Sequence, residues 1–177
     1  IASQNPHGLR MTLSAVIGLA PEHKLRVISE DVGGGFGSKA FNYSEEVICA
    51  WASKVVGRPV KWTADRNEAF LTDAHGRDQL AQAEMYLDED KNITGLKVSI
   101  TANMGAYLST FGSLIPTYMC VPLLSGQYAI PAIYAEVKGV YTNTSPVDAY
   151  RGAGRPEAAF IIERLVDLAA RKTGTSP

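Results

Sequence analysis

The sequence predicts an α+β fold, with mixed sheets and flanking helices. In the first third of the chain, segments with helical spacing alternate with short apolar stretches that are typical of strands. In the middle, residues 79–87 and 93–102 are strand-like and are joined by the polar stretch 88–92, which predicts an antiparallel hairpin. Near the end, apolar residues recur at helical spacing after Pro156, which predicts a long final helix.

The first predicted helix and strand lead into a glycine-rich loop. Asn5 followed by Pro6 is typical of a helix start, and Gly18 is typical of a helix end. Residues 25–28 then predict a short strand that delivers the chain into residues 33–39.

A second helix and strand are expected after this loop. Asn42 and Glu45 have the spacing of a capping box, and Gly57 marks the expected helix end. The apolar positions between them predict a buried stripe made of Val47, Ile48, Trp51, Ala52 and Val55. Residues 60–64 predict a second strand.

The second half adds one more strand and the final helix. Residues 134–141 predict a strand, whereas residues 104–126 show little periodicity and receive no assignment. The final helix is expected to begin near Pro156 and to end at Gly174. Its predicted core face comprises Ala158, Ile161, Ile162, Leu165, Leu168 and Ala169.

Length and composition exclude several classes of protein. The chain has 177 residues, of which 46% are hydrophobic, so a domain with a substantial core is expected. The formal net charge of -1 argues against electrostatic binding to nucleic acid or to an anionic membrane. No apolar run reaches the roughly 18 residues that a membrane span needs, and no signal peptide opens the sequence.

Neither a disulfide framework nor a metal site made of protein ligands is expected. Cys49 and Cys120 are far apart in the sequence and form no CxxC pair, so we expect reduced, buried thiols. His7, His23 and His75 show no spacing that is typical of metal ligands.

The most distinctive stretch is residues 33–39, with the sequence Gly-Gly-Gly-Phe-Gly-Ser-Lys. Glycines allow positive φ and a close approach of the backbone to a bound group, and successive amides in such a turn can converge on an anion. Phe36 adds a large rigid ring, for which a flexible linker has no use. From the loop alone, a tight strand-to-helix turn and a ligand cradle remain open.

A second loop of similar character, residues 149–155, opens the final helix. Arg151 and Arg155 lie among glycines at a helix N-terminus, where free amides, the helix dipole and guanidinium groups all favour an anion. The alternative for both arginines is an ion pair with a nearby acid. Glu157 is a candidate catalytic base, but a glutamate in the first helical turn is also favoured by the dipole alone.

A nucleotide-binding interpretation of the first loop is the alternative. Residues 35–40 fit the pattern G-x-G-x-x-A, and Asp65 follows the next predicted strand as a ribose-binding acid would. The polar stretch 38–43 delays the helix, however, so the glycines would not lie at its N-terminus. A P-loop is excluded because Gly37 is not followed directly by Lys and Ser or Thr. A Rossmann-type NAD-binding domain of a dehydrogenase therefore remains the second hypothesis.

Three segments together resemble a known family. Residues 3–7 (Ser-Gln-Asn-Pro-His), 33–39 and 149–155 (Ala-Tyr-Arg-Gly-Ala-Gly-Arg) occur in the order and spacing of the molybdenum hydroxylases, the xanthine dehydrogenase and aldehyde oxidase family. The resemblance runs along essentially the whole chain. It is strongest to the large subunit of aerobic carbon monoxide dehydrogenase, in the variant called form II.

The resemblance implies roles for individual residues. Gln4 matches the glutamine that hydrogen-bonds a molybdenum ligand, although capping of the first helix is an alternative role. The implied cofactor-binding residues are Gly34, Gly35, Phe36, Gly37, Arg151 and Gly152. The implied substrate pocket comprises Phe36, Met119 and Ala153. In this family the pterin dithiolene binds the metal, so no protein ligand to molybdenum is expected, and protein donors tune the site from outside.

Departures from the family pattern bear on the substrate. Gly152 stands where true carbon monoxide dehydrogenases carry a copper-holding cysteine, and Cys120 is no evident substitute. Ala153 replaces the aromatic residue of xanthine-oxidising relatives, and Ala40 replaces their acid after the loop lysine. A purine-binding arginine of those relatives would fall near Met119. These differences leave an aldehyde, aromatic or N-heterocyclic compound as the expected substrate, hydroxylated with water as oxygen source.

The resemblance also implies a larger assembly. Residues 1–177 are expected to be a fragment of the molybdopterin-binding domain, truncated at both ends, with possible subdomains 1–75 and 76–177. The general base would be a glutamate beyond residue 177, so the fragment alone would be inactive. Expected partners are an iron–sulfur subunit with [2Fe-2S] clusters and a flavin subunit with FAD, in a cytoplasmic dimer of heterotrimers. The pterin is expected to carry a cytosine dinucleotide. A non-catalytic assembly remnant is a third hypothesis.

Overall fold

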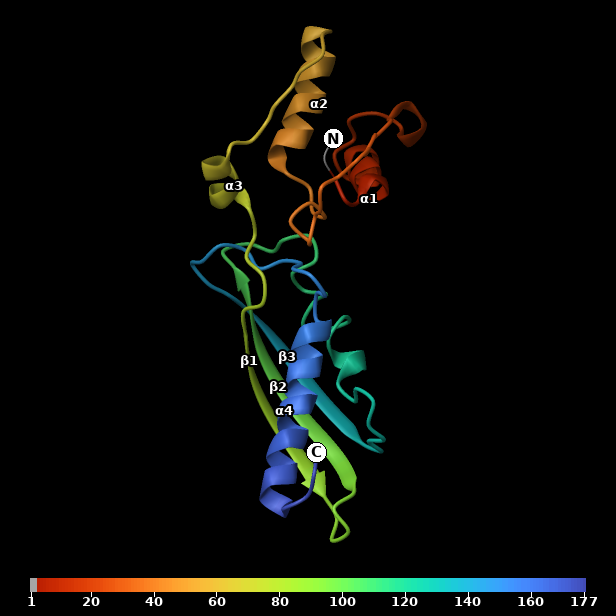
Figure 1. Ribbon diagram of the computed structural model, residues 1–177. Helices are drawn as coiled ribbons and strands as arrows, with labels where there is room; N and C mark the ends of the chain where they lie inside the picture. Colours follow the sequence, from red (N-terminus) through yellow and green to blue (C-terminus); the bar gives the residue numbers. More distant parts are fainter. Residues whose placement is uncertain (1–2) are drawn as a thin grey trace. The chain divides into compact units, whose positions relative to one another are not determined.

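The computed structural model describes residues 3–177 and contains two compact units, divided between Asp73 and Ala74 (Figure 1). Within the described residues, helices α1, α2 and α3 belong to the first unit, and a three-stranded sheet and helix α4 belong to the second. The presence of both helices and a mixed three-stranded sheet confirms the predicted α+β class.

The first helix forms where the sequence predicts it. Helix α1 (Pro6–Met11) is capped by Asn5, whose side-chain oxygen accepts a hydrogen bond from the Gly8 N–H at 3.2 Å. A π-helical turn, η1 (Thr12–Val16), continues it, and Gly18 follows with a φ of 68°. A short 3-10 turn, η2 (Glu22–Lys24), ends this part of the chain.

Helix α2 (Ser44–Val56) also forms, but the predicted capping box is shifted by one residue. The helix starts at Ser44, so the third helical residue is Glu46, and its Oε2 accepts a hydrogen bond from the Tyr43 N–H at 3.1 Å. Asn42 and Glu45 therefore do not form the box. Gly57 ends the helix with a φ of 63°, as expected.

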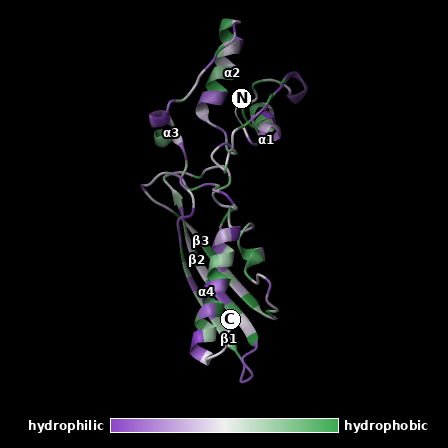
Figure 2. Ribbon diagram, in the orientation of Figure 1, coloured by the Kyte–Doolittle hydropathy of each residue, from purple (hydrophilic) through white to green (hydrophobic). Residues whose placement is uncertain are grey.

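The buried stripe predicted for α2 is wrong. Ile48 and Trp51 are each 57% exposed, Val55 is 62% exposed, and no residue of α2 is fully buried. Figure 2 shows the hydrophobic positions along this helix. Helical spacing identifies which face is apolar, but burial also requires a surface that covers the face. Residues 3–73 do not provide that surface.

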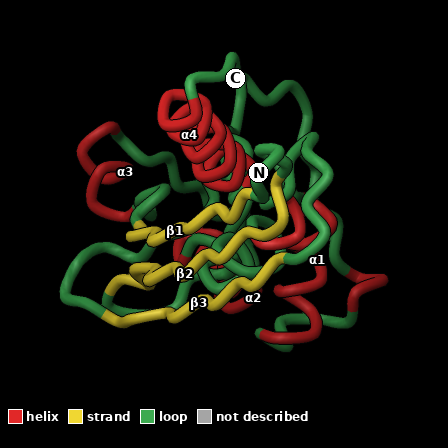
Figure 3. Tube along the Cα trace, turned by 90° about the horizontal axis from the view of Figure 1, so that it is seen from below, coloured by secondary structure: helices red, strands yellow, loops and turns green. Residues whose placement is uncertain are grey.

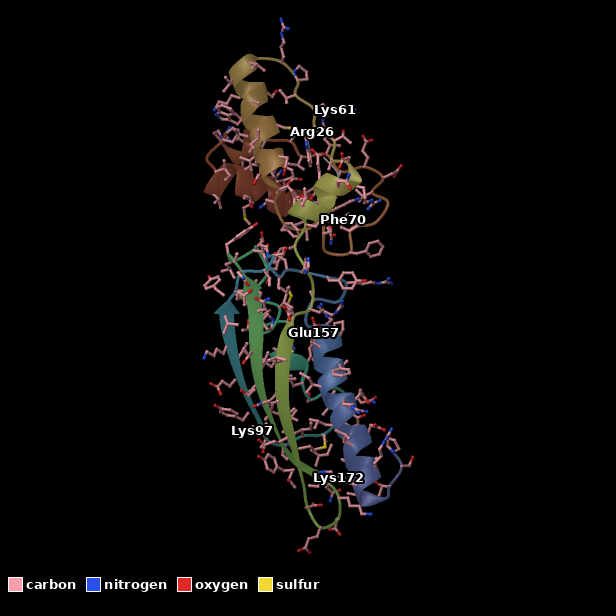
Figure 4. All side chains as sticks on the ribbon, turned by 90° about the vertical axis from the view of Figure 1, so that its left-hand side faces the viewer. Arg26, Lys61, Phe70, Lys97, Glu157 and Lys172 are labelled. Atoms are coloured by element: carbon pink, nitrogen blue, oxygen red, sulfur yellow. The ribbon has the colours of Figure 1, made fainter. Side chains whose placement is uncertain are left out.

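Both strands predicted in the first unit are wrong as well. Residues 25–28 and 60–64 form no strand, because they pair with no other segment within residues 3–177. After the second of these segments comes helix α3 (Arg66–Thr72), which periodicity did not reveal. Its side chain Phe70 is 79% exposed (Figure 4).

The second unit is built on a mixed sheet in the order β1-β2-β3. Strands β1 (Gln79–Leu87) and β2 (Ile93–Gly105) are antiparallel, which confirms the predicted hairpin. In the turn between them, Asp88 Oδ1 accepts a hydrogen bond from the Asn92 N–H at 2.7 Å. Strand β3 (Ile133–Tyr141) pairs with β2 in parallel, after a connection that contains the short turn η3 (Val121–Leu123).

Helix α4 (Arg155–Thr173) lies across one face of this sheet (Figure 3). Alternate residues of β2 point into the core, whereas Lys97 lies on the other face, where it pairs with Glu84 (Figure 4). Ala158, Ile161 and Ile162 of the predicted helix face are buried, but Leu168 is 40% exposed. The core consists of Leu96, Val98, Ile100, Ala102, Met104, Cys120, Leu124, Ala158, Ile161 and Ile162.

Both cysteines are unpaired thiols, and they differ in environment. Cys120 is fully buried in this core, as predicted, and burial raises the pKa of its thiol to about 11. Cys49, on α2, is only partly buried, contrary to the prediction.

Candidate functional site

The first glycine loop has a backbone that few residues tolerate. Gly34 and Gly37 have φ values of 110° and 107°, and Phe36 lies between them at 54° although it is not a glycine. A Cβ atom on Gly34 would lie 2.6 Å from the Phe36 ring. Such conformations persist only where the surrounding contacts hold them, and they cluster at binding sites.

Gln4 supplies the central contact. The side-chain Oε1 of Gln4 accepts a hydrogen bond from the Gly37 N–H at 3.0 Å, and the backbone N–H of Gln4 donates to the Lys39 carbonyl at 3.1 Å. A Cβ atom on Gly35 would lie 2.0 Å from the same Oε1, so the close approach requires glycine there. Because a backbone N–H can only donate, the amide oxygen must face Gly37, which leaves the Nε2 group of Gln4 as a donor for another partner.

The alternative role for Gln4, capping of the first helix, is not observed, because Asn5 caps α1. The structure thus brings Gln4 together with Gly35 and Gly37, three residues that the resemblance assigned to one site.

The end of this loop, at Ser38, is held by contacts that the sequence did not reveal. The Tyr43 hydroxyl contacts the Asp73 carboxylate and lies 2.7 Å from the Ser38 carbonyl oxygen, while Ser38 Oγ donates to Asp73 Oδ2 at 3.3 Å. Burial and the hydrogen bond to Asp73 raise the pKa of Tyr43 well above its ordinary value. No local pattern links these three positions, which are up to 35 residues apart.

The NAD-binding alternative is not favoured. Asp65 caps helix α3: its Oδ1 accepts from the Glu68 N–H, and Glu68 Oε2 accepts from the Asp65 N–H, both at 2.8 Å. Its carboxylate is therefore engaged in a local cap. The βαβ unit that a dinucleotide fold requires is also missing from residues 3–73, because neither predicted strand forms.

The second loop is equally constrained. Gly152, Ala153 and Gly154 have successive positive φ values of 101°, 42° and 92°. A Cβ atom on Gly154 would lie 2.6 Å from the Ile115 carbonyl oxygen and 2.9 Å from that of Met119. Met119, one of the predicted substrate-pocket residues, thus lies against Gly154, which follows Ala153 in the chain, whereas Phe36 belongs to the first unit.

Arg77 and Glu157 contact this loop. Arg77 Nη2 donates to the Arg151 carbonyl, and its guanidinium lies 4.4 Å from the centre of the Tyr150 ring. Arg77 Nε lies 3.6 Å from Glu157 Oε1, and Glu157 Oε2 accepts a hydrogen bond from the Gly154 N–H at 3.0 Å. Figure 4 shows Glu157 at the start of α4. Sequence reasoning missed Arg77 entirely.

These contacts bear on the roles of Glu157 and Arg155. Both oxygens of Glu157 are engaged and its side chain is 8% exposed, which favours a structural role over that of a catalytic base. Arg155 donates from Nη1 to the Gly152 carbonyl at 3.2 Å, so it holds the loop backbone. Arg151 is exposed to solvent.

The donors that remain suit an anionic cofactor. No acceptor within residues 3–177 pairs with the N–H groups of Gly34, Gly35 or Gly152. In the same part of the chain, no group of three or more His, Cys, Asp and Glu residues could hold a metal ion. Backbone N–H donors of this kind fit the anionic groups of a molybdenum–pterin cofactor.

Two surface hollows lie away from the residues of the glycine loops. The larger one, about 450 Å³, is a shallow depression beside the start of β2 and residues 132–134, at the end of the sheet away from the second loop. A second hollow lies between the hairpin and the end of α4. Neither is lined by a predicted site residue.

Comparisons with known proteins agree with a cofactor-binding role for the two loops. The family model described as "Molybdopterin cofactor-binding domain" matches residues 1–177. The carbon monoxide dehydrogenase large chain of Hydrogenophaga pseudoflava is 42% identical over 97% of this chain, and the 6-hydroxypseudooxynicotine dehydrogenase complex subunit gamma of Paenarthrobacter nicotinovorans is 36% identical over 96%. The structure of quinoline 2-oxidoreductase from Pseudomonas putida 86 superposes with a TM-score of 0.90 over 99% of the chain, at 35% identity.

The chain spans 22%, 21% and 22% of the lengths of these three proteins, respectively. Within residues 3–177, none of the helices combines the length and the apolar character that crossing a membrane requires. Sequence, loop geometry and comparisons lead to one assignment: the chain belongs to the molybdopterin cofactor-binding domain family.

Proposed function

We propose that residues 1–177 are part of a longer large subunit of a molybdenum hydroxylase, and that the loops at 33–39 and 149–155 supply donors to its pterin cofactor. When bound, this group would supply the redox-active metal that takes up the electrons of substrate oxidation. The observation that carries the proposal is the contact of Gln4 with Gly35 and Gly37, which fixes the orientation of the glutamine amide.

The first loop would act through hydrogen bonds from neutral groups. The Gln4 amide oxygen is occupied by the Gly37 N–H, so its Nε2 donor is available to a ligand of the metal. The N–H groups of Gly34 and Gly35 have no acceptor among residues 3–177 and would donate to the cofactor. Donors that are fixed in advance bind a charged group without having to reorganise.

The second loop would act through the Gly152 N–H and the Arg151 side chain. Gly152 precedes helix α4, where the helix dipole favours negative charge. The guanidinium of Arg151 suits phosphate or other anionic oxygen atoms on the pterin.

The substrate class follows from the small residues of the second loop. Gly152 offers no thiolate for copper, so we infer an organic substrate in place of carbon monoxide. Ala153 leaves that substrate without an aromatic ring to stack on. Two similar proteins carry names that refer to quinoline and to a hydroxypseudooxynicotine, both N-heterocyclic compounds. We infer hydroxylation of an N-heterocyclic, aromatic or aldehyde substrate, with water as oxygen source.

The remaining inferences concern the assembly. We infer that the pterin carries a cytosine dinucleotide and that electrons leave through a [2Fe-2S] subunit and an FAD subunit. The relatives named as a large chain and as a subunit of a complex support an assembly of several subunits. A cytoplasmic dimer of heterotrimers is the expected form.

Metal and pterin analysis of the purified full-length protein tests the proposal. It should be expressed in cells that load a control molybdoenzyme. We expect close to one molybdenum and one pterin per subunit, and a reduced content in Gly35→Ala, whose Cβ would displace Gln4. Protein free of both metal and pterin, from cells in which the control is loaded, would contradict the proposal and favour a non-catalytic assembly role.

A further inference from the structure

The side chain of Arg77, which lies outside the second loop and α4, contacts two consecutive residues of that loop. Its guanidinium donates to the Arg151 carbonyl and covers the Tyr150 ring at 4.4 Å. One planar group thus fixes a carbonyl and an aromatic ring on consecutive residues, which an ammonium on a flexible stem does less well.

Glu157 completes the connection from the other side. Its Oε1 lies 3.6 Å from Arg77 Nε, and its Oε2 accepts from the Gly154 N–H at 3.0 Å. The side chain is only 8% exposed, so water competes weakly for either oxygen. The carboxylate therefore links Arg77 to the end of the loop, while the guanidinium holds its beginning.

Arg77 itself rests on an anchored segment. The His75 N–H donates to the Pro146 carbonyl at 2.9 Å, and the Asp148 N–H donates to the His75 carbonyl at 2.8 Å. Asp148 is 1% exposed, and its Oδ2 accepts from the Phe111 N–H at 3.1 Å. These hydrogen bonds attach the segment before β1 to the segment before the second loop. The backbone of Arg77 is therefore fixed close to the loop that its side chain contacts.

The loop needs such support. Gly152, Ala153 and Gly154 have consecutive positive φ values. A positive φ is unfavourable for Ala153, because its Cβ atom crowds the backbone in this conformation. A strained backbone of this kind relaxes unless neighbouring groups hold it. The pair Arg77–Glu157 touches both ends of the strained segment.

We propose that Arg77 and Glu157 are positioning residues for the cofactor loop, which hold the backbone of residues 150–154 so that the Gly152 N–H and Arg151 are presented to the pterin group. Neither is a catalytic residue, since both act through the loop. The part of the inference that concerns the cofactor rests on the proposed function; the holding of the loop does not.

Hydrogen exchange and molybdenum content of the full-length protein test this proposal. Arg77→Met removes every polar contact of the side chain, Arg77→Lys keeps the charge, and Glu157→Gln keeps an acceptor for Gly154. Arg164→Met is the matched control, because Arg164 also forms an ion pair on α4, with Asp167 at 3.2 Å, but is exposed. Exchange is followed in cofactor-free protein at the amides of Ala153 and Gly154, and molybdenum is measured per folded molecule.

For Arg77→Met we expect exchange in residues 150–154 to accelerate about tenfold or more, with β1–β3 unchanged, and molybdenum content to fall several-fold. Arg77→Lys should restore part of the exchange protection and part of the molybdenum content. Arg164→Met should match the wild type in both measurements. Unchanged exchange in Arg77→Met would overturn the holding role. Faster exchange with wild-type molybdenum content would overturn the role toward the cofactor. A wild type that lacks molybdenum would overturn the proposed function and this second role with it, while the exchange rates would still decide the first.

Discussion

Each of the two glycine loops contains three residues with positive φ, but different contacts hold the two loops. The first loop is held by a hydrogen bond to the neutral side chain of Gln4. At Ser38 it is also held by contacts with Tyr43 and Asp73. The second is held by an ion pair, Arg77 with Glu157, that reaches the loop from both sides. A neutral amide can hold a loop and still donate to a ligand, whereas a buried carboxylate is used up by the contacts that neutralise it. Under the proposed function, the side chain of Gln4 would therefore both hold the first loop and bind the cofactor, whereas different residues would do so in the second loop.

The largest expected effect is in the second loop, from Gly154→Ala. Its Cβ would lie 2.6 Å from the Ile115 carbonyl oxygen, in a backbone with a φ of 92°. We expect a loss of about 3 kcal/mol or more in the opening free energy of the second unit, measured by native-state hydrogen exchange. Gly174→Ala is the control, because Gly174 also has a positive φ of 67° but no atom within 4 Å of a Cβ. It should cost about 1 kcal/mol. Equal losses would mean that the close packing of Gly154 is unimportant.

Gln4 allows the two functions of the first loop to be separated. Gln4→Ala leaves the Gly37 N–H without its acceptor and should weaken the loop by about 1 kcal/mol, with a lower molybdenum content. Gln4→Glu keeps that acceptor but loses the Nε2 donor. We expect it to retain near wild-type exchange at Gly37 while turnover of the loaded enzyme falls. If Gln4→Glu turned over at the wild-type rate, the Nε2 donor would have no role.

Tyr43 makes the stability of the first unit depend on alkaline pH. An unfolded tyrosine loses its proton near pH 10, whereas burial and Asp73 raise the pKa of Tyr43 in the folded state. The unfolded state thus binds fewer protons above pH 10, so stability should be intact below that pH and fall as the pH rises further. Exchange at Ser38 and Lys39 should accelerate above pH 10 beyond the intrinsic rate. Tyr43→Phe should remove this extra pH dependence, while Tyr86→Phe, at an exposed tyrosine of β1, should keep it.

The smallest expected effect concerns the two thiols. Burial raises the pKa of Cys120 to about 11, so only about one molecule in a thousand carries its thiolate at pH 8. Iodoacetamide should therefore label the partly buried Cys49 first and Cys120 only upon unfolding, as followed by mass spectrometry. Because the pKa of Cys120 is raised, its contribution to stability should be lost as the pH rises from about 9 to about 11. Equal labelling of both thiols at pH 8 in the native protein would contradict the buried environment.

The sequence predicted the second unit better than the first. The hairpin and α4 have long, regular patterns, and the surfaces that bury them lie in the same unit. Residues 25–28 and 60–64 are short apolar stretches, and whether such a stretch pairs depends on partners that its own sequence does not specify. The stripe of α2 failed for the same reason, because the pattern identifies an apolar face and not its cover.

The loops themselves were found from their glycines, and the resemblance linked Gln4 to them. Their supports were not found. Arg77 acts over 74 residues on Arg151, and Tyr43 over 30 residues on Asp73, so no local spacing could connect them. One local sign exists in the sequence: Gly76 precedes Arg77, and a Cβ there would lie 2.5 Å from the Tyr150 side chain. A glycine beside an arginine is too common, however, to indicate a contact between distant loops.

The central claim is that backbone N–H groups of both glycine loops bind the pterin cofactor, and a crystal structure of the molybdenum-loaded full-length protein tests it most directly. The account predicts cofactor atoms about 3 Å from the N–H groups of Gly35 and Gly152, with the Gln4 amide oxygen still accepting from Gly37. The claim would be contradicted if the electron density placed the cofactor away from one or both loops, with the N–H groups of that loop bonded to water.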